Sequence, residues 1–324
     1  MTLNPLNLNS IMKNLFSRKF LVIAATCILG WVFTWISILG FKHYGWVLFL
    51  LLPFFLGAVP TLAYGFRNQV TKGQLFDVSM TTLVLYIVGL LLFAIEGLIC
   101  IVFVGPLALL CTWLGHWVAY RVLKYWEGNA KAIIGILVFL LPTFMAFENI
   151  QEDDEKLRSV TTSIEIDAPA SVVWKNVIAF AQLDEPDEWL FKTGIAYPIN
   201  ATIEGEGVGS VRHCNFTTGP FVEPITVWDE PRLLRFSVTS QPPPMKEISP
   251  YDLHPPHLDG FWLSKEGQFR LIELENGKTR LEGTTWYVNK IKPDFYWTLW
   301  SDYIVHTIHK RVLRHIRNQC SGVN

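Results

Sequence analysis

Charged residues are scarce in this sequence of 324 residues, since Asp, Glu, Lys and Arg together make up only 17% of it. A soluble globular chain normally devotes about a quarter of its residues to them. The charges are also divided unevenly: residues 1–148 carry nine Lys/Arg and four Asp/Glu, whereas residues 149–324 carry 18 and 24. This distribution excludes a single soluble domain and a disordered chain. It also excludes a nucleic-acid binder, because the less hydrophobic half is the acidic one.

Cysteine pairs and the common catalytic motifs are missing as well. The five cysteines are widely spaced, three of them stand in apolar segments, and Cys214 belongs to no Cys-x-x-Cys pair. A disulfide scaffold is therefore not expected. The sequence contains no Gly-rich phosphate loop, no Gly-x-Ser-x-Gly nucleophile turn and no His-Glu-x-x-His zinc motif. We accordingly predict no cofactor.

Long hydrophobic runs fill most of residues 20–147. A helix needs about 20 apolar residues to cross a bilayer core of about 30 Å. Five segments have this character, although the fifth is short, and such recurrence excludes a cleavable signal peptide. We predict membrane helices over 20–41, 45–66, 81–104, 106–123 and 132–147, with Gly105–Pro106 as the turn of a tight hairpin.

Lys and Arg residues gather beside alternate ends of these spans. They precede the first span, follow the second and separate the fourth from the fifth: Lys13, Arg18, Lys19, Arg67, Lys72, Arg121, Lys124 and Lys131. Because such residues stay on the cytoplasmic side, residues 1–19 are expected in the cytoplasm. Five spans make the chain a multi-pass cell-membrane protein whose soluble C-terminal half is extracytoplasmic. Four spans, with the fifth segment lying in the interface, would keep that half in the cytoplasm.

Glu96 stands in the middle of an apolar run and is predicted to lie within a span. A carboxyl group in lipid is costly and is often functional. The alternative is a neutral Glu96 that bonds to an adjacent helix and fixes packing, which we favour because no second charged residue appears in any predicted span. Gly89, Gly97 and Gly105 recur every eight positions and predict close helix contacts.

The second half begins after a polar linker, residues 148–158, and has a mixed pattern. Alternating β-branched and polar residues predict a strand from Ser159, and Pro169 opens a helical pattern. A further short helix is expected around 185–191, and a long amphipathic helix over 293–318 ends the domain. Strands are expected over 200–204, 209–217, 222–229, 233–239, 267–274 and 279–287. This order indicates an α+β domain over 159–320, in which a curved antiparallel sheet wraps on the C-terminal helix.

The segment IEIDAPASVVWKNVIAF, at residues 164–180, resembles the start of the START-like polyketide cyclase and lipid-transport superfamily (SRPBCC). The strand LEGTTWY followed by a long helix is similar to the end of the same helix-grip fold. The resemblance covers about 160 residues, from Ser159 to Gln319. It implies a deep cavity between the sheet and the C-terminal helix that holds an apolar or amphipathic ligand. The membrane half has no counterpart in the simple members of that superfamily.

Six of the eight histidines lie between residues 213 and 315, and two of them share a helix face with an acid. Asp302, His306 and His309 stand at i, i+4 and i+7 of the C-terminal helix, so they lie within about 60° of one another. This arrangement suits acid–base chemistry and, less well, a metal ion. The alternative, which we favour, is an exposed polar flank in which Asp302 pairs with His306.

The loop over residues 241–262 holds six prolines together with His254 and His257. A structureless loop of this length is uncommon unless it covers or binds something. We interpret it as a lid whose Trp262 and histidines contact a ligand. The alternative is a stiff connection packed against the end of the sheet.

Charged residues at alternate strand positions form the third candidate cluster. Arg212 and Glu223 are predicted to face inward together with Arg270 or Glu282, in which case each needs a partner because lone buried charges are costly. A paired Arg and Glu could hold the polar head of a ligand. Solvent-facing cross-strand pairs are an equally good interpretation.

Three functions follow from these patterns. The favoured one is a membrane-anchored domain that binds or transfers a hydrophobic small molecule such as a lipid, quinone, isoprenoid or polyketide-like compound. Its partners would be the bilayer and that ligand, contacted by Arg212, Glu223, His254, His257, Trp262, Glu282, Trp286, Trp297 and Trp300. The second is a cyclase, dehydratase or hydrolase that uses Asp302, His306, His309, Glu223 and His254. The third is a ligand-sensing membrane protein. A catalytic site predicts that two or more of the acid–base residues converge.

Overall fold

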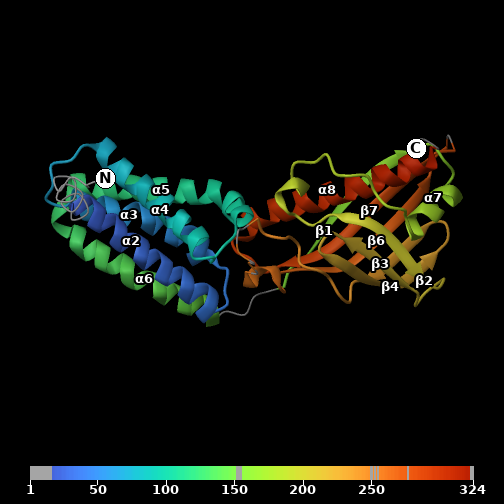
Figure 1. Cartoon of the computed structure of the whole chain (residues 1–324), viewed down its shortest axis with the longest axis horizontal. Helices are drawn as coiled ribbons and strands as arrows, with labels where there is room; N and C mark the ends of the chain where they lie inside the picture. Colours follow the sequence, from blue (N-terminus) through green and yellow to red (C-terminus); the bar gives the residue numbers. More distant parts are fainter. Residues whose placement is uncertain are drawn as a thin grey trace, which may run out of the picture. The chain divides into compact units, whose positions relative to one another are not determined.

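The computed structural model describes residues 17–150, 155–248, 251, 253, 255–275 and 277–321. The chain divides into two compact units, one of Met1–Glu152 with Ser249–Pro256 and one of Asp153–Ile248 with His257–Asn324. Figure 1 shows that the first unit is helical and that the second is built on a sheet. His254, most of the predicted N-terminal segment, residues 151–154 of the linker and the hairpin residue Asn276 lie outside the described residues.

Five apolar helical segments make up the first unit. They are α2 (Arg18–Trp35) with η1 (Ile36–Gly40), η2 (Val47–Leu51) with α3 (Leu52–Gly65), α4 (Lys72–Leu92), α5 (Leu98–Trp126) and, after η3 (Glu127–Asn129), α6 (Ala130–Ile150). In the described part of the chain, all five are long and apolar enough to cross a membrane. The short fifth segment of the sequence is thus a helix of 21 residues.

The predicted hairpin turn at Gly105–Pro106 is wrong. Both residues lie inside α5, and the chain breaks instead over residues 93–97, after α4. A proline is tolerated within a membrane helix because neighbouring groups satisfy the freed carbonyl. Helix α4 begins at Lys72, nine residues before the predicted start at residue 81. Thr71 and Gln74 form a reciprocal capping box, which is the sequence signal that marks this start.

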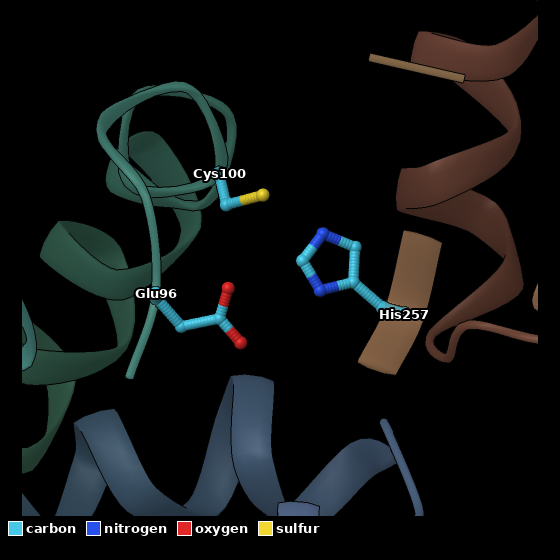
Figure 2. Close-up of side chains that lie close together, drawn as sticks. All are labelled: Glu96, Cys100 and His257. Atoms are coloured by element: carbon cyan, nitrogen blue, oxygen red, sulfur yellow. The ribbon is translucent and has the colours of Figure 1, made fainter. Parts of the chain in front are cut away.

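Glu96 therefore lies in the connection between α4 and α5 and not within a span, and Cys100 follows in the first turn of α5 (Figure 2). The hydroxyl of Tyr44, in the connection between the first two spans, donates to Glu96 Oε1 over 3.2 Å. The prediction that Glu96 occupies the middle of a span is corrected accordingly.

Helices α3 and α5 contact each other through their backbones. A Cβ atom on Gly57 would stand 2.0 Å from the carbonyl oxygen of Thr112, and one on Gly115 would stand 2.1 Å from that of Phe54. Only glycine fits at both positions, as is typical of closely packed membrane helices. Beside this crossing, the Thr61 hydroxyl bonds to Nδ1 of the buried His116 over 3.0 Å.

The second unit contains a seven-stranded antiparallel sheet in the order β1-β7-β6-β5-β4-β3-β2. Its strands are β1 (Leu157–Ile166), β2 (Pro198–Glu204), β3 (Val211–Phe216), β4 (Gly219–Asp229), β5 (Leu233–Ser237), β6 (Trp262–Glu273) and β7 (Thr279–Asn289). Helix α7 (Ala170–Ile178) follows β1, and the long helix α8 (Asp294–Cys320) ends the domain. The predicted α+β plan is confirmed, including every predicted strand. The helix expected around 185–191 is not formed; the described chain there is irregular up to a short helical turn, η4 (Phe191–Thr193).

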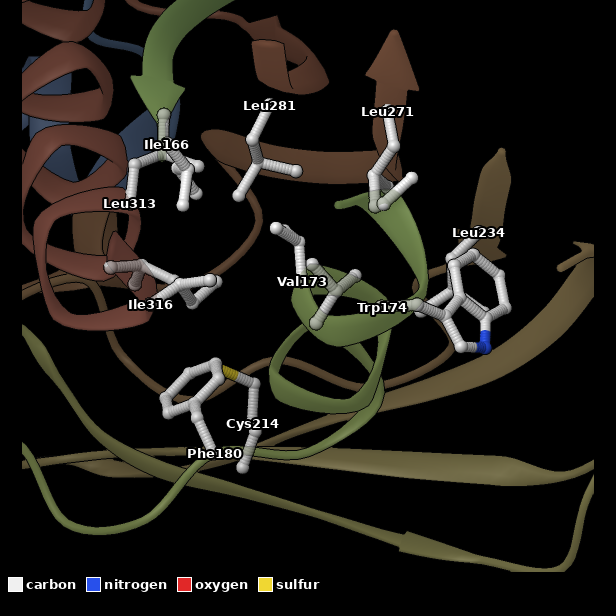
Figure 3. Close-up of a cluster of buried hydrophobic side chains, with 14 of the residues drawn as sticks. Ile166, Val173, Trp174, Phe180, Cys214, Leu234, Leu271, Leu281, Leu313 and Ile316 are labelled. Carbon is white, nitrogen blue, oxygen red and sulfur yellow. The ribbon is translucent and has the colours of Figure 1, made fainter. Parts of the chain in front are cut away.

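One face of the sheet, here called the inner face, packs against α7 and α8. Val173 and Trp174 of α7 and Leu313 and Ile316 of α8 form one buried cluster with inward side chains of the strands, as Figure 3 shows. A smaller buried cluster joins Val160 and Tyr287 of the sheet to Val305, near the middle of α8. Two apolar clusters therefore hold α8 against the inner face, one around Val305 and one around Leu313 and Ile316.

Candidate site on the inner face of the sheet

The polar stripe of α8, formed by Asp302, His306 and His309, faces the sheet beside these two clusters. The hydroxyl of Tyr287, on β7, donates to Asp302 Oδ1 over 2.6 Å. Thr162 of β1 approaches both His306 and His309, so residues at i, i+4 and i+7 of the helix converge on the inner face. The interpretation of this stripe as an exposed flank is wrong, since each of the three side chains contacts the sheet.

Four side chains form a continuous set of hydrogen bonds that we call the imidazole–hydroxyl chain: His306, Thr162, His309 and Thr285. Thr162 Oγ1 lies 2.7 Å from His306 Nδ1 and 3.1 Å from His309 Nδ1. Thr285 Oγ1, from β7, lies 2.8 Å from His309 Nε2. Both ring nitrogens of His309 are thus bound to hydroxyl groups and neither is left for a metal ion, so this structure does not favour a metal at Asp302, His306 and His309.

Burial decides the charge of His309. Loss of solvent lowers the pKa of its imidazole to about 4, and the nearby His306 acts in the same direction. The ring is therefore neutral at pH 7, with one nitrogen that donates and one that accepts. Burial and the hydrogen bond to Asp302 both raise the pKa of the Tyr287 hydroxyl. Tyr287 therefore keeps its proton and donates it to the carboxylate of Asp302.

Several inner-face side chains around this chain are partly exposed. The ring of Trp262 stacks on Tyr287 with 5.5 Å between ring centroids, and Trp262 itself is only partly buried. Phe269, Thr285, His306 and His309 are also partly exposed. Aromatic, hydroxyl and imidazole groups that are not fully buried therefore lie together on the inner face.

Arg212 and Glu223 face inward and form an ion pair across β3 and β4. This agrees with the interpretation of an inward-facing pair and not with that of a solvent-facing one. Arg212 is 1% exposed and Glu223 is 6% exposed. The guanidinium also donates through Nε to the carbonyl of Ile178 over 3.1 Å and lies 5.4–5.6 Å from the ring centroids of Phe180, Phe236 and Phe269. Burial raises the pKa of Glu223 more than the attraction of Arg212 lowers it. The pair is self-contained, since each charge has the other as its partner.

Of the remaining predicted site residues, Trp286 and Glu282 lie on the opposite side of the sheet, and the other described ones lie outside its strands. Trp286 points to the opposite side of β7 from Tyr287 and lies over the guanidinium of Arg235 at 4.9 Å. Glu282 stands on that same outer side, in register with the exposed Arg270. Trp297 and Trp300 lie in the first turns of α8, and His257 is buried in η5 (Pro256–Leu258).

The proline-rich loop predicted as a lid is divided between the two units. Its residues Ser249–Pro256 belong to the first unit, where Leu253, Pro255 and Pro256 line a mainly apolar pocket of about 610 Å³. Trp31 and Trp35 of α2 and Phe93 after α4 are among the other lining residues. This part of the loop therefore covers helices of the first unit.

Thr162, Thr285 and Tyr287 complete the candidate site and were missed from the sequence. Their positions could have been found from strand alternation, because Thr162 shares a face of β1 with Val160 and Ile164, and Thr285 shares a face of β7 with Leu281. Their bonds to α8 depend on how the helix is rotated over the sheet, which no local pattern reports.

No protein-family model matches the chain, and no curated protein matches it. Several solved structures are similar to about half of it. Norcoclaurine synthase from Thalictrum flavum has 13% identity and a TM-score of 0.33, covering 52% of this chain and 97% of its own. Zhui aromatase/cyclase from Streptomyces sp. R1128 has 15% identity and a TM-score of 0.32, covering 51% and 94%. A protein from Nitrosospira multiformis has 17% identity and a TM-score of 0.32, covering 50% and 96%. TM-scores of this size establish no family, ligand or activity for this chain.

Proposed function

We propose that this protein is a membrane-anchored binding or transfer protein whose α+β domain holds a hydrophobic small molecule between the sheet and α8. The observation that carries this proposal is the middle of the inner face. There Phe269 and Trp262, which pack at the margins of the two buried clusters, are partly exposed and lie on the same face as Thr285, His306 and His309. Binding sites for small molecules are typically apolar and aromatic with a few placed polar groups.

The five apolar helices support the anchoring half of the proposal. Their length and composition fit a bilayer, and the exposed side chains of α2, α4 and α5 include many large apolar ones, such as Val32, Val84 and Val102. A protein with such helices meets its ligand where hydrophobic molecules are concentrated.

An enzyme is the second candidate, and the convergence of His306, His309 and Asp302 favours it. Two imidazoles joined through a hydroxyl can give and accept protons, which is the requirement of acid–base catalysis. Catalysis by this site would still need a bound substrate on the same inner face, so ligand binding is the function to test first.

The test is to purify the full-length protein in detergent and to identify the non-polar molecules that remain with it by mass spectrometry. We expect one class of molecule enriched to about one per chain. Thr285→Phe, which fills the middle of the inner face, should lose it, whereas Thr226→Phe on the exposed side of β4 should keep it. Hydrogen exchange of β3 and β4 checks that both variants are folded. Identical extracts from the three proteins would contradict the proposal.

A further inference from the structure

The polar groups of the inner face also restrict the chemistry of the ligand's head group. Apart from the buried ion pair of Arg212 and Glu223 and the bond of Tyr287 to Asp302, the polar groups described on this face include the imidazole–hydroxyl chain. Within the part of the chain that the structure describes, His306 Nε2 and the second hydrogen-bonding position of Thr285 Oγ1 have no protein partner. These two atoms are the ends of the chain, and a ligand would meet one of them.

The protons of the chain can be counted for the state in which both rings are neutral. Thr162 has one hydroxyl proton and touches two ring nitrogens, so it donates to one imidazole and accepts from the other. If Thr162 donates to His309, then His309 donates to Thr285 and His306 donates to Thr162. His306 Nε2 is then an acceptor, and the Thr285 proton is free to donate. If Thr162 donates to His306, every bond reverses: His306 Nε2 donates and Thr285 Oγ1 accepts.

In either arrangement the chain offers one donor at one end and one acceptor at the other. A ligand hydroxyl, which both donates and accepts, matches either end. A ligand carbonyl matches the end that donates. A carboxylate only accepts, and its two oxygens provide about four lone-pair positions, so one donor leaves most of them unsatisfied.

The nearby charges offer an anion little compensation. Arg212 is already bound by Glu223 and by the carbonyl of Ile178. His309 is neutral at pH 7 because burial lowers the pKa of its imidazole. Asp302, one turn before His306 on α8, adds a negative charge to the same stripe. Arg158, opposite Tyr287 in the register of β1 and β7, is a cation at this end of the stripe, and Asp302 carries the opposite charge beside the same Tyr287.

We propose that the imidazole–hydroxyl chain selects an amphipathic ligand with an uncharged oxygen head, an alcohol or a ketone, over one with a carboxylate. This inference rests on the proposed function, because it assigns the head group of the molecule held on the inner face. The chain acts as the head-group contact, and the aromatic residues Phe269 and Trp262 contact the apolar part.

The test uses three probes that share one sixteen-carbon, diazirine-bearing tail and end in an alcohol, a methyl ketone or a carboxylic acid. Full-length protein in phosphatidylcholine nanodiscs is photolabelled at pH 7.4, and the labelled peptides are mapped by mass spectrometry. Competition by unlabelled probes, referred to the concentration of each in the bilayer, gives their relative affinities. We expect saturable labelling of β6, β7 and α8, with the alcohol and the ketone preferred over the acid by about tenfold or more.

Thr162→Val keeps the shape of the side chain and removes the bridging hydroxyl, so it should reduce that preference to less than about threefold. Thr162→Ser restores the hydroxyl and should restore the preference. Thr161→Val is the matched control, because Thr161 bonds to Thr284 on the opposite face of the same strands. Hydrogen exchange of β1 checks that all three variants are folded.

The outcomes separate the two proposals. Failure of all three probes to give saturable labelling on the inner face would overturn the proposed function. Saturable labelling in which the acid competes as well as the alcohol would leave that function standing and overturn the head-group inference. An unchanged preference in Thr162→Val would overturn the inference as well.

Discussion

Replacing Arg212 by methionine tests the role of the buried ion pair most directly. The substitution removes the ion-pair partner of Glu223, whose side chain is 6% exposed in the parent. The methionine would stand where the guanidinium now lies, beside the rings of Phe180, Phe236 and Phe269. Breaking a buried pair from one side costs about 3–5 kcal/mol, because the remaining charge stays desolvated. The double variant Arg212→Met/Glu223→Leu removes both charges and should recover most of that loss.

The destabilisation of Arg212→Met should depend on pH in a defined direction. Arg212 lowers the pKa of Glu223, so its removal raises that pKa further above the value in the unfolded chain. A raised carboxyl pKa means that the folded state favours the protonated carboxyl group. Keeping that proton costs no folding free energy at acid pH and costs increasingly more as the pH rises. The difference in stability between the variant and the parent should widen with rising pH, by up to about 1.4 kcal/mol per pH unit.

Hydrogen exchange of the β3 and β4 amides is the appropriate measurement, because a protein of two units does not unfold in one step. The matched control is Arg235→Met, which opens the pair of Arg235 and Glu266. Those side chains are 39% and 41% exposed, so the loss there should stay below about 1 kcal/mol. Equal losses in Arg212→Met and Arg235→Met, or an effect of Arg212→Met that does not change with pH, would refute the reasoning.

Two further predictions concern the helix crossing and the imidazole pair. Gly115→Ala places a Cβ atom 2.1 Å from the carbonyl oxygen of Phe54 and should cost about 1–3 kcal/mol or more, seen as a lower thermal midpoint of the detergent-solubilised protein. Gly105→Ala, with no atom within 4 Å of the new methyl group, should leave the midpoint unchanged, and equal midpoints would contradict this account. Since the pKa of His309 is about 4 when folded and about 6.5 when unfolded, its contribution to stability is complete above pH 6.5 and is lost as the pH falls towards 4. His309→Gln should flatten the acid sensitivity of hydrogen exchange in β7 and α8, and parallel pH profiles of variant and parent would disprove this.

Much of the architecture could be predicted from local patterns. The alternation of SVTTSIEID and the helical periodicity after Pro169 each report a single element, and these elements are β1 and α7 in the structure. The five apolar helices were predicted from the lengths of the apolar runs. Run length gives the number of helices but does not locate the turns between them. Gly105 and Pro106 form no turn, since both lie inside α5; a long apolar helix can absorb the one hydrogen bond that a proline removes.

The candidate site could be predicted only in part. Helical spacing showed that Asp302, His306 and His309 share a face, but the direction of that face depends on packing between α8 and the sheet. On α8, Val305, Val312, Leu313 and Ile316 are buried, whereas Ile304 and Ile308 are only partly buried, which fixes how the helix is rotated over the sheet. This rotation of the helix turns the histidines towards Thr162 and Thr285. Glu282 and Trp286 were assigned to a ligand without knowledge of the strand register, which puts them on the outer side.

The contact of Gly57 with α5 has a consequence for how the protein is made. The partner residues Thr112 and His116 are synthesised more than 50 residues after Gly57. At about 5–20 residues per second, α3 exists for several seconds before α5 leaves the ribosome. Until then its glycine face has no α5 to pack against, and the hydroxyl of Thr61 lacks its bond to His116. A chain truncated before α5 would keep this surface uncovered, and quality-control proteases would have a feature by which to distinguish it from the finished protein.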